Sequence, residues 1–74
     1  MNNNRDQAAI KKFGEHLRLI RIAKNLSQQE LELKAGISKN QIGNIERGEV
    51  NITLTSALAI ASALEIPTKD LFDF

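Results

Sequence analysis

The chain has 74 residues, of which 42% are hydrophobic, so it is long enough for one domain with a single modest core. It contains no cysteine and one histidine, His16, which excludes a disulfide framework, a thiolate metal site and a histidine cluster. No apolar run approaches the roughly 20 residues that span a bilayer, and the first residues lack the apolar stretch of a signal peptide, so we expect a cytoplasmic protein.

The formal net charge of +1 conceals an asymmetry along the chain. Residues 1–48 carry nine Lys and Arg against five Asp and Glu, a net +4, whereas residues 49–74 carry one lysine against four acidic residues, a net −3. A basic first part would be drawn to a polyanion, while an acidic second part would face solvent or a partner. Surfaces are often uneven by chance, so charge alone does not identify the partner.

The first elements can be placed by periodicity. Residues 1–7 are polar and aperiodic and predict a flexible N-terminal tail, followed by a single domain over residues 8–74. From about Gln7 to Lys24, apolar residues recur at three- and four-residue spacing and predict an amphipathic helix. Its apolar stripe consists of Ile10, Phe13, Leu17 and Ile20. Asn25 follows, and asparagine tolerates the left-handed conformation that often ends a helix.

Two capping boxes then mark two helix starts only eleven residues apart. Ser27 and Glu30 have the S-x-x-E spacing and predict a second helix from Gln28 to about Lys34. Ser38 and Gln41 repeat this spacing in the S-x-x-Q form and predict a third helix that ends at Gly48. Gly36 suits the tight connection between them, because glycine accepts a positive φ without a Cβ penalty.

The last part of the chain predicts two more helices. Thr53 is a plausible cap for a fourth helix over residues 54–64, with a core-facing stripe of Leu54, Ala57, Leu58, Ala61 and Leu64. Pro67 separates it from a short final helix over residues 68–72, with Asp70 near its positive end. The expected architecture is therefore five short helices without a strand.

A short helix, a glycine turn and a second short helix can hold one helix outward, where it fits a major groove about 12 Å wide. The sequence LSQQEL at residues 26–31, AGIS at 35–38 and IERG at 45–48 resembles the Cro and lambda-repressor-like (XRE) family of helix-turn-helix regulators. The resemblance continues through Ile60-Ala61 and Ala63-Leu64 to Asp70-Leu71-Phe72, and so covers about residues 10–73.

This resemblance implies an all-α, five-helix lambda-repressor-like DNA-binding domain in which the second and third helices form the helix-turn-helix. It implies a small transcriptional regulator that binds double-stranded DNA sequence-specifically, with a recognition helix over about residues 38–47 in the major groove. The base contacts that it implies are Lys39, Asn40 and Asn44. Their chemistry agrees, since lysine suits the O6 and N7 acceptors of guanine and asparagine can grip adenine.

The same resemblance assigns DNA phosphate contacts. Gln28 lies in the first turn of the second helix, where the amide ends favour an anion. Gln41 and Arg47 are weaker candidates, since the capping box can occupy Gln41 and Arg47 can equally point into solvent. Asn51 fits a phosphate contact and a plain turn role equally well.

Arg21 and Glu46 resemble a family ion pair that ties the first helix to the end of the recognition helix. Such a pair would matter for orientation more than for net stability, because desolvation offsets much of the Coulomb gain. The alternative is two unrelated surface charges.

Four features depart from the family pattern. Glu32 stands where alanine is usual, facing the crossing of the two helices, and Leu33 takes a position that is commonly charged. Gly43 lies inside the recognition helix and costs about 1 kcal/mol in propensity relative to alanine. After Gly48 there is no Lys or Arg until Lys69, so an arginine probing the minor groove from this segment is not expected.

Apolar residues near the end of the chain exceed the obvious needs of one small core. We expect a symmetric homodimer that presents two recognition helices about 34 Å apart to a palindromic operator. The interface residues predicted for it are Ala59, Ser62, Ile66, Leu71, Phe72 and Phe74. The alternative for these residues is that they complete the core of the monomer.

Other functions have less support. The alternative is a protein-interaction module, antitoxin-like or an accessory subunit, that uses the same scaffold and binds DNA weakly. An enzyme is not expected, because no nucleophile, base and acid set or phosphate loop is visible and His16 falls on the polar side of the first helix. We expect no cofactor, no metal and no small-molecule effector.

Overall fold

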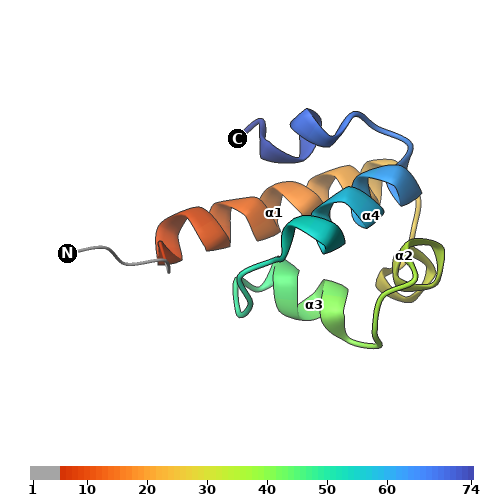
Figure 1. The fold of residues 1–74 in the computed structure, drawn as a ribbon, viewed down its shortest axis with the longest axis horizontal. Coiled ribbons are helices and arrows are strands. Elements are labelled where there is room, and N and C mark those ends of the chain that lie inside the picture. The colour runs from red at the N-terminus through yellow and green to blue at the C-terminus, as the bar shows by residue number, and fades with distance from the viewer. Residues whose placement is uncertain (1–5) are drawn as a thin grey trace.

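The computed structural model describes residues 6–74, which form four α-helices and one 3-10 helix (Figure 1). The elements are α1 (Gln7–Ala23), α2 (Gln28–Ala35), α3 (Gln41–Glu46), α4 (Leu54–Leu64) and η1 (Thr68–Phe72). No residue from 6 to 74 lies in a strand, so the all-α prediction is confirmed for this part of the chain.

The predicted fifth helix is a 3-10 helix rather than an α-helix. The Asp70 amide donates to the Pro67 carbonyl three residues earlier at 3.0 Å, which is the 3-10 pattern. With five residues, η1 has the short length typical of 3-10 helices. The predicted boundaries, 68–72, agree with those of η1.

The long helix α1 runs through the middle of the molecule between α3 and η1 (Figure 1). It contacts both α3 and η1, while α2 contacts α3 and α4. In Figure 1, α3 and η1 lie on opposite sides of the layer that α1 and α4 form. The predicted recognition helix α3 therefore lies on the opposite side of the molecule from η1.

A single core joins all five elements. Its buried members are Phe13, Leu17, Leu31, Ile42, Ile45, Ala57, Ile60, Ala61, Leu64 and Leu71. Of the predicted stripe of α1, Phe13 and Leu17 are buried in the core, Ile20 packs against it half-buried, and Ile10 is half-buried. The predicted stripe of α4 is wrong in part, since Leu54 and Leu58 are 72% and 48% exposed and Ile60 is fully buried. The buried stripe 57, 60, 61 and 64 has the i, i+3, i+4, i+7 spacing of one helix face.

Most predicted helix ends are confirmed. Ser27 accepts from the Glu30 amide at 3.0 Å and Glu30 accepts from the Ser27 amide at 2.8 Å, so the first capping box is formed. Thr53 caps α4 by accepting from the Ser56 amide at 3.1 Å. Asn25 and Gly36 have φ values of 60° and 67°, the left-handed conformation expected after α1 and α2.

The N-terminal boundary also differs slightly from its prediction. Residues 1–5 of the predicted tail lie outside the described residues. Asp6 caps α1 by accepting from the Ala9 amide at 3.1 Å, and the Gln7 side chain donates to the Gly48 carbonyl at 2.8 Å. Asp6 and Gln7 therefore belong to the folded domain although the predicted tail extended to residue 7, and α1 begins at Gln7 as its apolar periodicity predicted.

The start of α3 contradicts the sequence pattern. The second capping box is not formed, because Asn40 has a φ of 70° and the helix begins only at Gln41. The Gln41 amide donates to the Ser38 backbone carbonyl at 3.2 Å, so Ser38 begins a turn instead of capping a helix. The predicted recognition helix over 38–47 is therefore a turn followed by the six-residue helix α3.

A close approach of backbones fixes α3 against α1. A Cβ atom at Gly14 would lie 2.2 Å from the Ile45 carbonyl oxygen and 2.7 Å from that of Glu46. Only glycine fits at this crossing, a requirement that the sequence pattern did not reveal. The contact brings the end of α3 directly onto α1.

Candidate nucleic-acid interface

The predicted base-reading residues lie along the exposed turn and α3. Lys39 and Asn40 are exposed in the turn before the helix, and Asn44 is half-buried one turn further on. The left-handed conformation of Asn40 and the exposed Lys39 place two polar side chains ahead of the N-terminus of α3. The structure thus presents these residues partly from a turn rather than wholly from a helix.

The predicted pair Arg21 and Glu46 is in contact and nearly closed to solvent. The Arg21 Nε donates to Glu46 Oε2 at 2.6 Å and its Nη2 donates to Oε1 at 3.1 Å, with side-chain exposures of 10% and 3%. Arg21 Nη1 also donates to the Leu26 carbonyl at 2.8 Å. Hydrogen bonding to the Glu46 carboxylate raises the pKa of the Arg21 guanidinium. This bidentate pair joins the end of α3 to α1 and to the α1–α2 link.

Gln28 joins the same network from α2. Its Nε2 donates to Glu46 Oε1 at 2.9 Å, so one carboxylate receives bonds from both α1 and α2. A Cβ atom at Gly43 would lie 3.2 Å from the Gln28 Oε1 and 3.0 Å from an Arg47 nitrogen. Gly43 therefore leaves room for these two side chains to fold over α3.

Arg47, a predicted phosphate contact, already has partners within the chain. Its Nε donates to Glu49 Oε2 at 3.0 Å, and its Nη2 donates to Asn44 Oδ1 at 2.6 Å and to Glu49 Oε1 at 3.3 Å. Hydrogen bonding to Glu49 raises the pKa of the Arg47 guanidinium. Both charged side chains remain more than half exposed, so the pair is accessible from solvent.

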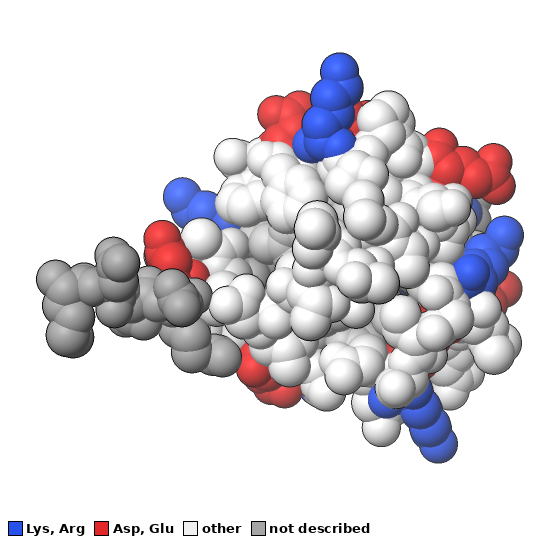
Figure 2. Space-filling view, viewed as in Figure 1, with Lys and Arg blue, Asp and Glu red and all other residues white. Residues whose placement is uncertain are grey.

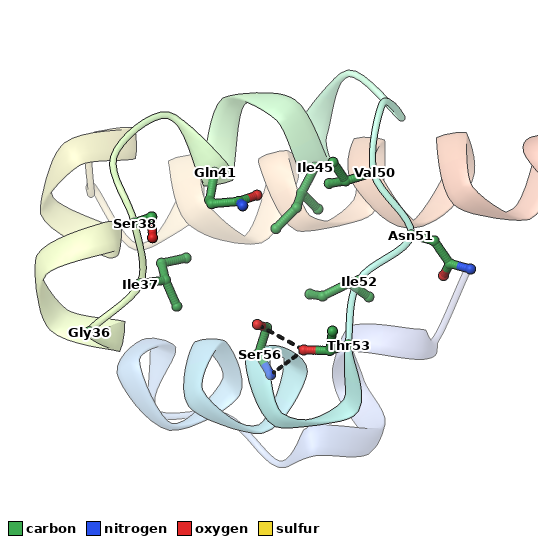
Figure 3. Close-up of a pocket in the computed structure, with 10 residues that line it drawn as sticks. All are labelled: Gly36, Ile37, Ser38, Gln41, Ile45, Val50, Asn51, Ile52, Thr53 and Ser56. Carbon is green, nitrogen blue, oxygen red and sulfur yellow. Dashed lines mark hydrogen bonds between the residues drawn. The ribbon is translucent and has the colours of Figure 1, made fainter.

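A groove of about 400 Å³ lies between α3, the α2–α3 turn and the beginning of α4 (Figure 3). Its polar lining includes the predicted phosphate contacts Gln41 and Asn51, while Ile37 and Ile45 form part of its apolar lining. In Figure 3, Gln41 extends along α3 and the side chain of Asn51 points away from the centre of the groove. Both predicted residues thus border one hollow beside α3, although ten positions separate them.

The predicted dimer residues have mixed surroundings. Ser62, Phe72 and Phe74 are exposed, and Ala59 and Ile66 are half-buried. Leu71 is fully buried in the monomer core and cannot serve as an interface residue, which corrects that assignment. The 3-10 turn directs the Leu71 side chain inward against the core, unlike its exposed neighbour Phe72.

Phe72 and Phe74 pack on the beginning of the fold. Their rings lie 5.3 Å and 6.3 Å from the ring of Phe13. His16, expected to be solvated, is half-buried, with its Nε2 2.7 Å from the Asp70 carbonyl oxygen and its ring 5.9 Å from that of Phe74. His16 therefore ties α1 to η1, a structural role.

The face that contains α4 is uncharged in its centre. The helix α4 has the sequence LTSALAIASAL, without an acidic or basic residue. Figure 2 shows the charged side chains at the rim of this face, around a broad uncharged middle. Leu54 and Leu58 add exposed apolar surface to α4 that the sequence pattern had assigned to the core.

Two residues near the reading surface were missed as functional candidates. Glu49 accepts a hydrogen bond from Arg47. The sequence feature that could have indicated this pair is an acidic residue two positions after an arginine. Glu32 is 6% exposed, and its Oε2 accepts from the Ile42 amide at 3.0 Å. The sequence feature that could have indicated a role for Glu32 is an acidic residue at a position where the family pattern has alanine.

Within residues 6–74, no helix is long and apolar enough to cross a membrane. The same residues contain no group of three or more His, Asp and Glu side chains placed to hold a metal ion.

The chain is similar to known regulators over most of its length. A family model described as Helix-turn-helix matches residues 17–71. The control protein C.BamHI of Bacillus amyloliquefaciens is 40% identical over 63 residues, which are 84% of this chain and 78% of that protein. The control protein C.SmaI of Serratia marcescens is 40% identical over 59 residues, 80% of this chain and 70% of that protein.

A solved structure has the same fold. The crystal structure of the restriction-modification controller protein C.AhdI from Aeromonas hydrophila superposes with a TM-score of 0.86 and 42% identity. The match covers 88% of this chain and 98% of that one. The chain therefore belongs to the XRE-type helix-turn-helix family of DNA-binding transcriptional regulators.

Proposed function

We propose that this regulator reads a specific duplex site by inserting α3 and the turn before it into the major groove. The observation that carries the proposal is the network of Arg21, Gln28 and Glu46, which fixes α3 to both α1 and α2. A rigidly held short helix with exposed polar residues at its start suits base recognition, because its side chains are then already positioned when the protein meets the DNA.

The base contacts proposed are Lys39, Asn40 and Asn44. Lys39 and Asn40 are exposed and can reach guanine or adenine edges without rearrangement of the fold. Asn44 Oδ1 is bonded to Arg47 in the free protein, so its amide nitrogen remains as a donor toward N7 acceptors. Release of Arg47 toward a phosphate would allow Asn44 to grip adenine with both polar atoms.

The phosphate contacts proposed are Arg47, Gln41 and Asn51, which lie at or after α3. Gln28 is proposed as a fourth phosphate contact that also braces α3, because one hydrogen of its Nε2 is donated to Glu46 and the other remains available to a phosphate. The backbone amides at the N-terminus of α2 still favour an anion there. Gln28→Ala is therefore expected to weaken both selective and unselective binding.

We further propose that the regulator acts as a homodimer on a palindromic operator. The uncharged face of α4, with Leu54 and Leu58 exposed, supplies the apolar surface, with Ala59 and Ser62 on the same helix. Phe72, Phe74 and Ile66 extend the apolar surface in the C-terminal segment. Because C.AhdI is a restriction-modification controller protein, genes of a restriction-modification system are the proposed targets.

The test is the selection of bound sites from a random duplex pool, followed by affinity measurements over a range of salt concentrations. We expect a symmetric recovered site and a steep loss of affinity with salt, with a slope that implies several phosphate contacts. Lys39→Ala and Asn44→Ala should relax base preference at particular positions. Recovery of no preferred sequence, together with a shallow salt slope, would instead favour a protein-interaction module.

A further inference from the structure

The carboxylate of Glu32 lies between α2 and the first turn of α3. The residue is 6% exposed, and its Oε2 accepts a hydrogen bond of 3.0 Å from the amide of Ile42, the second residue of α3. Burial of a carboxylate is unfavourable unless hydrogen bonds or charges compensate it. The exposed amides at a helix start provide both a donor and a partial positive charge.

The helix α3 depends on such an external contact. It has six residues, so it contains few internal hydrogen bonds and is too short to be stable alone. Asn40 stands at its N-cap position in the left-handed conformation and makes no side-chain capping bond. Ser38, whose spacing predicted the cap, begins a turn instead. Glu32 therefore supplies from another helix the bond that a local cap would normally make.

We propose that Glu32 is a positioning residue that sets where the recognition helix begins. The inference rests on the proposed function and adds a determinant of base selectivity that does not itself touch DNA. Glu32 and Lys39 also border the same hollow of about 320 Å³ beside the turn. Loss of the bond to Ile42 would let the turn and α3 move relative to α2. The side chains of Lys39 and Asn40 would then no longer be held in one position.

The bond can be tested first in the free protein by amide hydrogen exchange. Glu32→Ala and Glu32→Met both remove the acceptor, and methionine keeps much of the side-chain volume. We expect the protection of the Ile42 amide to fall about fivefold more than that of the Leu17 amide in the core. Glu32→Gln keeps an oxygen acceptor and should retain most of the protection.

Base selectivity is tested with the duplex recovered by site selection and a scrambled duplex at one salt concentration. We expect the ratio of the two affinities to fall about tenfold in Glu32→Ala and Glu32→Met, and to stay within about threefold in Glu32→Gln. Glu15→Ala is the matched control, because it removes the same charge from an exposed position on α1. Circular dichroism must show that each variant is folded at the assay temperature. If Glu32→Ala is unfolded, the comparison is made with Glu32→Met.

The outcomes separate this inference from the function on which it rests. An unaltered protein without selectivity for any duplex overturns both. Selective binding that persists in Glu32→Met, or equal protection of the Ile42 amide in Glu32→Met and the unaltered protein, overturns only the role of Glu32. A parallel loss of selectivity in Glu15→Ala would show that the effect is one of charge and would also overturn that role.

Discussion

At the scale of single residues, the surface proposed to bind DNA also contains a carboxylate that would compete with a phosphate for Arg47. Glu49 holds the Arg47 guanidinium through two bonds of 3.0 Å and 3.3 Å. A phosphate that contacts Nε or Nη2 of Arg47 would have to displace this carboxylate, and one that contacts Nη1 would lie near its negative charge. The pair is exposed, so it contributes little to folding stability and its main effect falls on binding.

Glu49→Gln should therefore strengthen binding to every duplex. We expect about a threefold gain in affinity at low salt and a salt slope steeper by about one phosphate contact. Asp73→Asn is the control, since it makes the same change of charge in the exposed C-terminal segment. An equal gain in the control would show that net charge alone is responsible.

Glu30 provides a pH-dependent contribution to stability. The backbone amide of Ser27 and then its hydroxyl lower the pKa of the Glu30 carboxyl below its ordinary value of 4.5. Because the folded-state pKa is lower than the unfolded one, the stabilisation is present above about pH 4.5. It is lost as the pH falls through the lowered folded-state pKa.

Urea unfolding of the unaltered protein and of Glu30→Gln, from pH 7 down to pH 3, measures this effect. The difference in unfolding free energy should be constant near neutral pH and should shrink below about pH 4.5. A difference that grows on acidification would contradict the assigned direction of the pKa shift.

At the scale of elements, local signals in the sequence predicted helix ends well where the chain itself provides the cap. The box at Ser27 and Glu30 and the cap at Thr53 involve residues within three positions, so spacing alone identifies them. The start of α3 could not be predicted in this way. Its capping oxygen comes from Glu32, ten residues before the amide that it binds.

The buried face of α4 was difficult to predict for another reason. Its sequence contains apolar residues at most positions, so several overlapping stripes satisfy the helical period. Packing of α4 against α2 and η1 determines which of these stripes is buried, and Leu54 and Leu58 remain exposed. Family resemblance could indicate Lys39 and Asn40 as candidate base contacts, but it could not indicate that they lie in a turn before α3.

The crossing of α1 and α3 gives a prediction that concerns the packing of elements. Gly14→Ala would place a methyl group 2.2 Å from the Ile45 carbonyl oxygen, and neither backbone can yield easily. We expect a loss of about 3 kcal/mol in the free energy of unfolding, measured by urea denaturation. Gly36→Ala is the comparison, because it meets nothing within 4 Å and has only the strain of a φ of 67°. It should cost about 1–2 kcal/mol, and a smaller loss at Gly14 than at Gly36 would contradict the close approach.

At the scale of the whole molecule, the charge asymmetry of the sequence corresponds to an arrangement in space. The basic residues 1–48 include the helix-turn-helix, whereas the acidic residues 49–74 form α4 and η1. In Figure 1, η1 lies across the fold from α3. A polyanion bound at α3 would therefore meet mainly the basic part of the chain, with Glu49 beside Arg47 as the exception, while η1 would remain on the far side.

The uncharged face of α4 gives a direct test of the dimer. Leu58 is 48% exposed, so Leu58→Glu adds a charge to this face without opening the core. We expect the unaltered protein to sediment as a dimer at high micromolar concentration and Leu58→Glu as a monomer, because a buried unpaired charge is strongly unfavourable at an interface. The variant should also lose the advantage of a duplex with two half-sites over a duplex with one.

Leu19→Glu is the matched control, since Leu19 is 66% exposed on α1 rather than on α4. It should leave both the oligomeric state and the preference for two half-sites unchanged. If Leu19→Glu dissociates the dimer and Leu58→Glu does not, the interface involves α1 and the proposed role of the α4 face is wrong. The unaltered protein could also be monomeric and still prefer a duplex with two half-sites. The copies would then associate only when bound side by side on the operator, and the α4 contacts would be too weak to keep a dimer together in solution.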